Sequence, residues 1–196
     1  MTAQSMQKRF SFGEFYRILR DGMRTAPRLS RARRLGLMDK PFMERIMMAV
    51  TEVNGCAMCS YAHSRMALSA GMSDSEIKKM LDGRFDDAPE EQMTAILFAQ
   101  HYADSRAKPD SKLWSRLTDR YGTIRAEGIL GAIRIIMMGN ALGIPWGSLI
   151  GRFRRKADPR SSLAYEVGML FGFIAIFPVA VVDAVIAGVT KRPLIR

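Results

Sequence analysis

The chain has 196 residues, which suits one domain with a sizeable hydrophobic core. Hydrophobic residues make up 48% of the sequence and charged residues 25%, near the globular average, so the composition excludes wholesale disorder and a polytopic membrane protein. The net charge of +11 would suit an anionic lipid, nucleic acid or an acidic protein, or simply a solvated basic face, and charge alone does not choose among them.

The first 40 residues are predicted to form a basic N-terminal helical extension. Phe15, Ile18 and Leu19 recur at helical spacing and predict a helix over roughly residues 13–23, followed by a basic connector over residues 27–37. The segment shows no signal peptide, no helix-turn-helix signature and no interleaved aromatic residues. These features favour a cytoplasmic protein and disfavour nucleic acid as a partner.

Residues 41–162 are predicted to form an all-α core, because apolar residues recur there at helical spacing and strand-like alternation is not evident. Ser73 and Glu76 have the spacing of a capping box, which predicts a helix start. Gly143 and Pro145 are expected to end the last helix of the core. The predicted helices cover about residues 41–53, 56–71, 73–83, 87–105, 109–121 and 123–142, with short loops typical of a helical bundle.

Residues 163–196 are predicted to form an apolar C-terminal helix or helical hairpin. The stretch 167–190 is long enough to span a bilayer, and Asp183 is its single charged residue. Pro178 would either kink one helix or divide the stretch into two. A membrane-associated tail and a helix buried in an oligomer interface both fit, and the basic clusters on either side favour association with a membrane surface.

Chemistry is concentrated in the pattern Glu44-x11-Cys56-x2-Cys59-x3-His63. Spacings of three and four residues place both thiols and the imidazole on one face of a helix, and the first turn of that helix favours a thiolate at Cys56. His63 could accept or relay a thiol proton near neutral pH. Either Glu44 or Glu52 could hold the imidazole, and their spacing leaves this choice open.

This pattern, with Asn54-Gly55 before the first cysteine and GMSDSEI after the histidine, resembles the alkyl hydroperoxidase D-like (AhpD-like) branch of the carboxymuconolactone decarboxylase superfamily. The resemblance covers roughly residues 41–145 and leaves the basic N-terminal segment and the apolar tail unexplained. It implies an AhpD-like helical bundle, here with an appended apolar C-terminal helical segment. It also implies a homo-trimer or homo-hexamer.

The resemblance implies a thiol-dependent antioxidant enzyme, an alkylhydroperoxidase-like thiol peroxidase or disulfide reductase. Cys59 would attack a hydroperoxide, Cys56 would resolve the product to a redox-active disulfide, and a dithiol protein would reduce that disulfide. His63 and Glu44 would form the proton relay, which leaves Glu52 at most a supporting role.

One position departs from the peroxidase pattern. Peroxidase members have a histidine directly before the second cysteine, whereas this chain has Met58, which cannot transfer a proton. An alternative is therefore a non-catalytic, membrane-proximal assembly or redox-sensing protein on the same fold. A carboxymuconolactone decarboxylase-type lyase is a weaker alternative, because those decarboxylases lack the cysteine pair.

Other candidate residues have simpler interpretations. A zinc site at the cysteine pair would lack an obvious fourth ligand, although His101 could supply one if the fold brought it close, so neither a metal nor a cofactor is expected. The many methionines fall in helical apolar patterns and are expected to fill the core. Tyr61 and Tyr102 could line a substrate pocket, but packing is the commoner role of single aromatic residues on helices.

Overall fold

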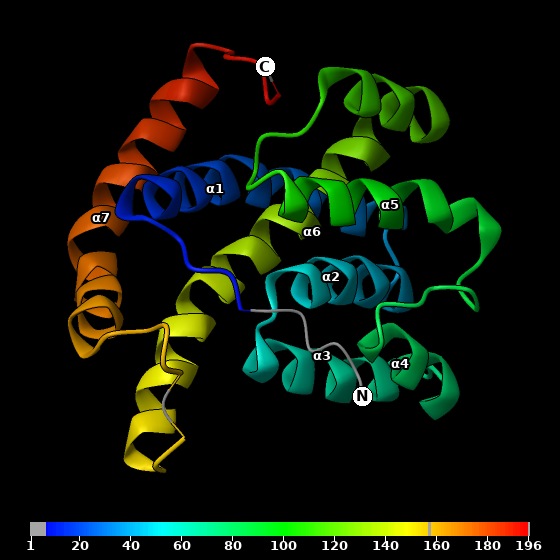
Figure 1. The fold of residues 1–196 in the computed structure, drawn as a ribbon. Helices are drawn as coiled ribbons and strands as arrows, with labels where there is room; N and C mark the ends of the chain where they lie inside the picture. Colours follow the sequence, from blue (N-terminus) through cyan, green and yellow to red (C-terminus); the bar gives the residue numbers. More distant parts are fainter. Residues whose placement is uncertain (1–6, 157, 196) are drawn as a thin grey trace.

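The computed structural model describes residues 7–156 and 158–195, and over these residues the chain forms seven α-helices and no strand. This confirms the all-α fold and the apolar C-terminal helix. Figure 1 shows α6 crossing the middle of the molecule, where it contacts α1, α2, α3, α5 and α7. The helices are α1 (Phe12–Arg34), α2 (Lys40–Asn54), α3 (Ala57–Ser69), α4 (Asp74–Leu81), α5 (Glu90–Asp104), α6 (Ser111–Phe153) and α7 (Leu163–Val189).

Helix α1 is longer than the sequence predicts. Its start is fixed by a capping box, in which the Ser11 hydroxyl accepts from the Glu14 amide and the Glu14 carboxylate accepts from the Ser11 amide. The helix then continues through Pro27 to Arg34, so the prediction of a connector over residues 27–37 was wrong. A proline inside a helix costs about 3 kcal/mol, so packing beyond Pro27 has to compensate for it.

That packing comes from α6. Leu29 and Ala32, both beyond the proline, are buried against the core. The two helices approach so closely at Gly128 of α6 that a Cβ atom there would lie 2.5 Å from the Cβ of Ala32. Helix α1 is thus part of the packed core, while a domain boundary at residue 40 or 162 stays a prediction.

Helices α2 to α5 lie close to their predicted positions because local signals set their ends. The Asp39 carboxylate accepts from the Phe42 amide at the start of α2, and Gly55, with φ of 71°, ends that helix. The Ser73 hydroxyl accepts from the Glu76 amide at the start of α4, as the predicted cap requires. These helices form the part of the molecule that holds the cysteine motif.

Helix α6 joins two predicted helices and extends past the predicted end of the second. The break expected after residue 121 is a kink at Gly122, where φ is 72° and ψ is 158°. The predicted end at Gly143 and Pro145 was wrong, since the helix runs on to Phe153. Ile144, Pro145 and Ser148 are all buried, so tertiary contacts hold this last part of the helix in place.

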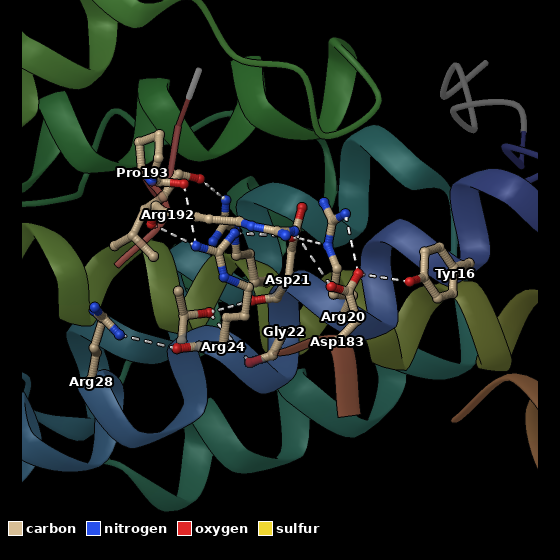
Figure 2. Close-up of polar contacts among 12 residues, drawn as sticks. Tyr16, Arg20, Asp21, Gly22, Arg24, Arg28, Asp183, Arg192 and Pro193 are labelled. Atoms are coloured by element: carbon tan, nitrogen blue, oxygen red, sulfur yellow. Dashed lines mark hydrogen bonds and ion pairs between the residues drawn. The ribbon is translucent and has the colours of Figure 1, made fainter. Parts of the chain in front are cut away.

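Helix α7 is one helix with Pro178 inside it, rather than a hairpin. Its inner face packs on α1, where the rings of Phe173 and Phe15 lie 6.4 Å apart between centroids. Asp183 also points to this side and accepts a hydrogen bond of 2.7 Å from the Tyr16 hydroxyl (Figure 2). The single charge of the apolar stretch is therefore satisfied by α1 within the same chain.

The outer face of α7 remains uncovered. Two helices in the described part of the chain are long and apolar enough to cross a membrane, α6 and α7, and this is weak evidence because core helices meet the same criterion. In α6, 78% of the apolar window is buried, as in a core helix, whereas in α7 only 17% is buried. The exposed apolar side chains of α7 recur at helical spacing and include Phe171, Ile174, Val179, Val182, Val185 and Val189.

Candidate functional site

The two cysteines lie at the start of α3. Cys56 is the N-cap residue of this helix, and its sulfur accepts a hydrogen bond from the Cys59 amide at 3.4 Å. The thiol of Cys56 thus occupies the place where the helix dipole and free amide groups stabilise a negative charge. Cys56 and Cys59 are joined in a disulfide, with their Cα atoms 5.3 Å apart.

His63 lies one turn beyond Cys59 and is held from α2. Its Nδ1 atom and the Oε2 atom of Glu44 are 2.7 Å apart, and both side chains are largely buried. With Glu44 as acceptor, Nδ1 carries the proton and Nε2 is left free to accept one. The structure therefore pairs His63 with Glu44, which is farther from it along the sequence than Glu52.

The nearer glutamate has a different neighbour. Glu52 accepts a hydrogen bond of 2.8 Å from the Ser60 hydroxyl. Burial raises the pKa of the Glu52 carboxyl above its usual value, and the hydrogen bond from Ser60 opposes this shift. Glu52 thus lies on the same helix as Glu44, and its carboxylate binds a serine of α3.

The sequence analysis missed Gly143 as a neighbour of the cysteines. A Cβ atom at this position of α6 would lie 2.8 Å from the sulfur of Cys56 and 2.8 Å from the sulfur of Cys59. Glycine thus allows the backbone of α6 to lie directly against the disulfide. The only signal in the sequence was a small residue in an apolar helix, and we had interpreted it as a helix end.

The two cysteines and the residues next to them differ in exposure. Cys56 is 1% exposed and Cys59 is 8% exposed, so Cys59 is the more accessible of the pair. Met58 and Tyr61 are 43% and 69% exposed, and the Cε atom of Met58 reaches α6, where it would lie 3.5 Å from a Cβ atom at Gly143. Tyr102, by contrast, is a buried core residue whose hydroxyl accepts from Arg134 at 2.9 Å.

His101 is engaged away from the cysteine motif. Its Nε2 atom accepts a hydrogen bond of 3.1 Å from the Asp110 amide, just before α6 begins. In the described part of the chain, histidine, cysteine and acidic side chains do not gather in a group of three or more that could hold a metal ion. The structure thus does not bring His101 to the cysteine pair as a further ligand.

One protein-family model matches part of the chain. The model of the carboxymuconolactone decarboxylase family matches residues 14–101, a segment that contains the whole motif from Glu44 to His63. Through this segment the chain is similar to the carboxymuconolactone decarboxylase family. The match begins within α1 and ends at His101. It therefore includes part of the N-terminal segment, which we expected to lie outside the resemblance, and it does not reach residues 102–145, which we expected to lie inside it. No curated protein and no solved structure matches the chain.

The contact at Gly143 predicts opposite effects for two similar substitutions in α6. Replacing a helical glycine by alanine ordinarily stabilises a protein by about 0.5–1 kcal/mol, and Gly147→Ala should do so because no atom lies within 4 Å of its added Cβ. Gly143→Ala should instead lower the free energy of unfolding by about 1–3 kcal/mol, because the new methyl group overlaps both sulfurs.

Urea unfolding of the two oxidised variants beside the unaltered protein measures this difference. The two variants should also be compared after the Cys56–Cys59 disulfide is reduced, because two separate thiols can move apart more easily than the sulfurs of a disulfide. Equal stabilisation by both alanines would show that α6 does not press on the cysteine pair.

Proposed function

We propose that the protein is a thiol-dependent reductase that consumes hydroperoxides through Cys56 and Cys59. The observation that carries this proposal is the buried contact between His63 and Glu44, one helical turn from a cysteine pair joined in a disulfide. A paired histidine and carboxylate would have no role in an inert structural disulfide. Similarity to the carboxymuconolactone decarboxylase family supports the proposal but does not by itself distinguish a peroxidase from a decarboxylase.

The reaction would begin with the reduced pair. His63, oriented by Glu44, takes the thiol proton of Cys59, and the thiolate attacks one oxygen of the hydroperoxide. The oxygen–oxygen bond breaks, Cys59 becomes a sulfenic acid, and the departing alkoxide takes up the proton to leave as an alcohol. Cys59 suits this attack because it is the more exposed of the two cysteines.

The second step would close the disulfide. The Cys56 thiolate attacks the sulfur of the Cys59 sulfenic acid, a sulfur–sulfur bond forms, and the hydroxyl group leaves as water with the proton from Cys56. A dithiol protein then reduces the pair by attacking Cys59. Cys56 is the better leaving group in that exchange, because its position as N-cap stabilises the thiolate that it becomes.

Stopped-flow measurement of peroxide consumption by the reduced protein tests this function. Cys59→Ser should reduce the rate to the background, since it removes the attacking sulfur. Glu44→Gln should lower the rate by about 100-fold, the usual scale of a general acid–base contribution, because His63 loses its charged partner. Glu52→Gln, a change of the same kind on the same helix, should cost much less.

Two results would contradict the proposal. If Cys59→Ser consumed peroxide as fast as the unaltered protein, the cysteine pair would not be the site of reduction. If Glu52→Gln cost as much as Glu44→Gln, the relay through His63 would be the wrong assignment.

A second proposal concerns where the protein works. We propose that the outer face of α7 associates with a membrane surface, because its exposed apolar side chains form one stripe along the helix. Basic residues flank the helix at both ends, among them Arg152, Arg154 and Arg155 before it and Lys191 and Arg192 after it. Such flanks are attracted to an anionic leaflet.

Co-sedimentation with vesicles of anionic phospholipid tests this association. The double variant Ile174→Gln with Val182→Gln should bind the vesicles less, because both side chains are exposed on the outer face of α7. Leu35→Gln, which alters an exposed leucine outside this face, serves as the matched control and should bind normally. Unchanged vesicle binding together with a smaller oligomer in sedimentation analysis would instead assign the face to a contact between copies of the chain.

A further inference from the structure

A cavity of about 500 Å³ opens on a different part of the molecule from the cysteine site. Its walls come from α1, from the connection between α5 and α6, from α6, from the end of α7, and from the segment after α7, residues 190–195, which we call the C-terminal arm. None of its lining residues belongs to α2 or α3, the helices that carry the cysteine motif. The volume is in the range of small-molecule binding sites.

The cavity is strongly basic. Asp21 is the one carboxylate that lines it in the described part of the chain, and Asp183 lies next to it, 3.7 Å from both Arg20 and Arg192 (Figure 2). Even with both carboxylates ionised, positive charge is in clear excess. The cationic residues of the lining are Arg17, Arg20, Arg24, Lys108, Arg134 and Arg192.

One of these cations is buried and incompletely satisfied. Arg134 of α6 is 3% exposed and donates from Nε to the Tyr102 hydroxyl at 2.9 Å and from Nη2 to the Leu194 carbonyl at 2.6 Å. Its Nη1 atom is also buried, and no atom of the described residues accepts a hydrogen bond from it. A buried guanidinium donor without an acceptor is costly, so a ligand oxygen at this position would be stabilising.

The C-terminal arm brings oxygen atoms to the cavity but no charge to balance it. Arg24 donates to the carbonyl oxygens of Arg192 and Pro193, at 2.8 and 3.3 Å. A peptide carbonyl accepts a hydrogen bond but carries no net charge, so the excess of arginines remains. An anion in the cavity would supply the missing charge.

The lowered pKa of Arg24 agrees with this excess of positive charge. Burial lowers the pKa of its guanidinium, Asp21 opposes that effect, and the neighbouring Arg134, Arg20 and Arg28 lower it further. The neighbouring cations thus make the charged form of Arg24 less favourable than it would be in an isolated ion pair.

We propose that this cavity binds a phosphate group, carried either by a small molecule or by the headgroup of an anionic lipid. Arginine guanidinium groups bind phosphate oxygens through paired, charge-assisted hydrogen bonds. A doubly charged phosphate offsets more of the basic excess than a single carboxylate does. Ala187, close to the end of α7, lines the cavity, so a phosphate held there would lie where the exposed apolar face of α7 ends.

Titration calorimetry of the full-length protein with inorganic phosphate, against chloride at equal ionic strength, tests the site. Arg17→Gln and Arg24→Gln should each weaken phosphate binding by about tenfold or more, the scale of a lost charge-assisted hydrogen bond. Arg17 is the safer variant, since within the described residues its side chain makes no hydrogen bond or ion pair that folding could require. Arg31→Gln, an exposed position of α1 outside the cavity, removes the same charge and should bind as the unaltered protein does.

Vesicles distinguish the two sources of phosphate. Tighter binding to vesicles of phosphatidylcholine with phosphatidic acid than to phosphatidylcholine alone, lost in Arg17→Gln but kept in Arg31→Gln, supports a lipid headgroup. Phosphate binding without that vesicle preference supports a small phosphorylated molecule. Equal behaviour of Arg17→Gln, Arg24→Gln and Arg31→Gln with both probes would overturn the proposal, as would no binding to either probe by the unaltered protein.

Discussion

The close contact between α6 and the cysteine pair is the constraint on which the rest of the site depends. Because Gly143 has no side chain, the backbone of α6 can press on both sulfur atoms, and the start of α3 is fixed against the central helix. The same helix packs on α1, α2, α5 and α7. The cysteine site is therefore attached to the core from one side, and Cys59 is the more exposed of the two cysteines.

The geometry gives each member of the motif a separate place. Cys56 lies at the N-cap, where its sulfur accepts an amide hydrogen bond, and Cys59 lies nearer the surface. Glu44 reaches His63 from α2, so this contact joins two helices that α6 also contacts. The outer face of α7 and the basic cavity belong to other parts of the molecule. The proposed thiol chemistry and the proposed binding of a lipid or phosphate group therefore use separate parts of the chain.

Much of this arrangement could be predicted from the sequence. The predictions failed where tertiary packing, which the local sequence does not reveal, decides the structure. Asp39 and Ser73 are local capping signals, and the helices that they start lie where expected. Pro27 and Pro145 are local stop signals, but burial of the residues beyond each proline keeps the helix intact. Spacing could not choose between Glu44 and Glu52, because the crossing of α2 and α3 decides which carboxylate meets His63. The approach of Gly143, far along the chain from the cysteines, left no recognisable pattern.

The central claim is that Cys59 is the sulfur that meets the oxidant. The most direct measurement is mass spectrometry of the Cys56→Ser variant after brief exposure to a hydroperoxide with a reagent that traps sulfenic acids. Without the resolving thiol, the intermediate should persist, and the account predicts a trapped sulfenic acid at Cys59. A Cys59→Ser variant treated in the same way should show little trapping at Cys56, which is the more deeply buried cysteine. Trapping at Cys56 and not at Cys59, or at neither residue, would contradict the account.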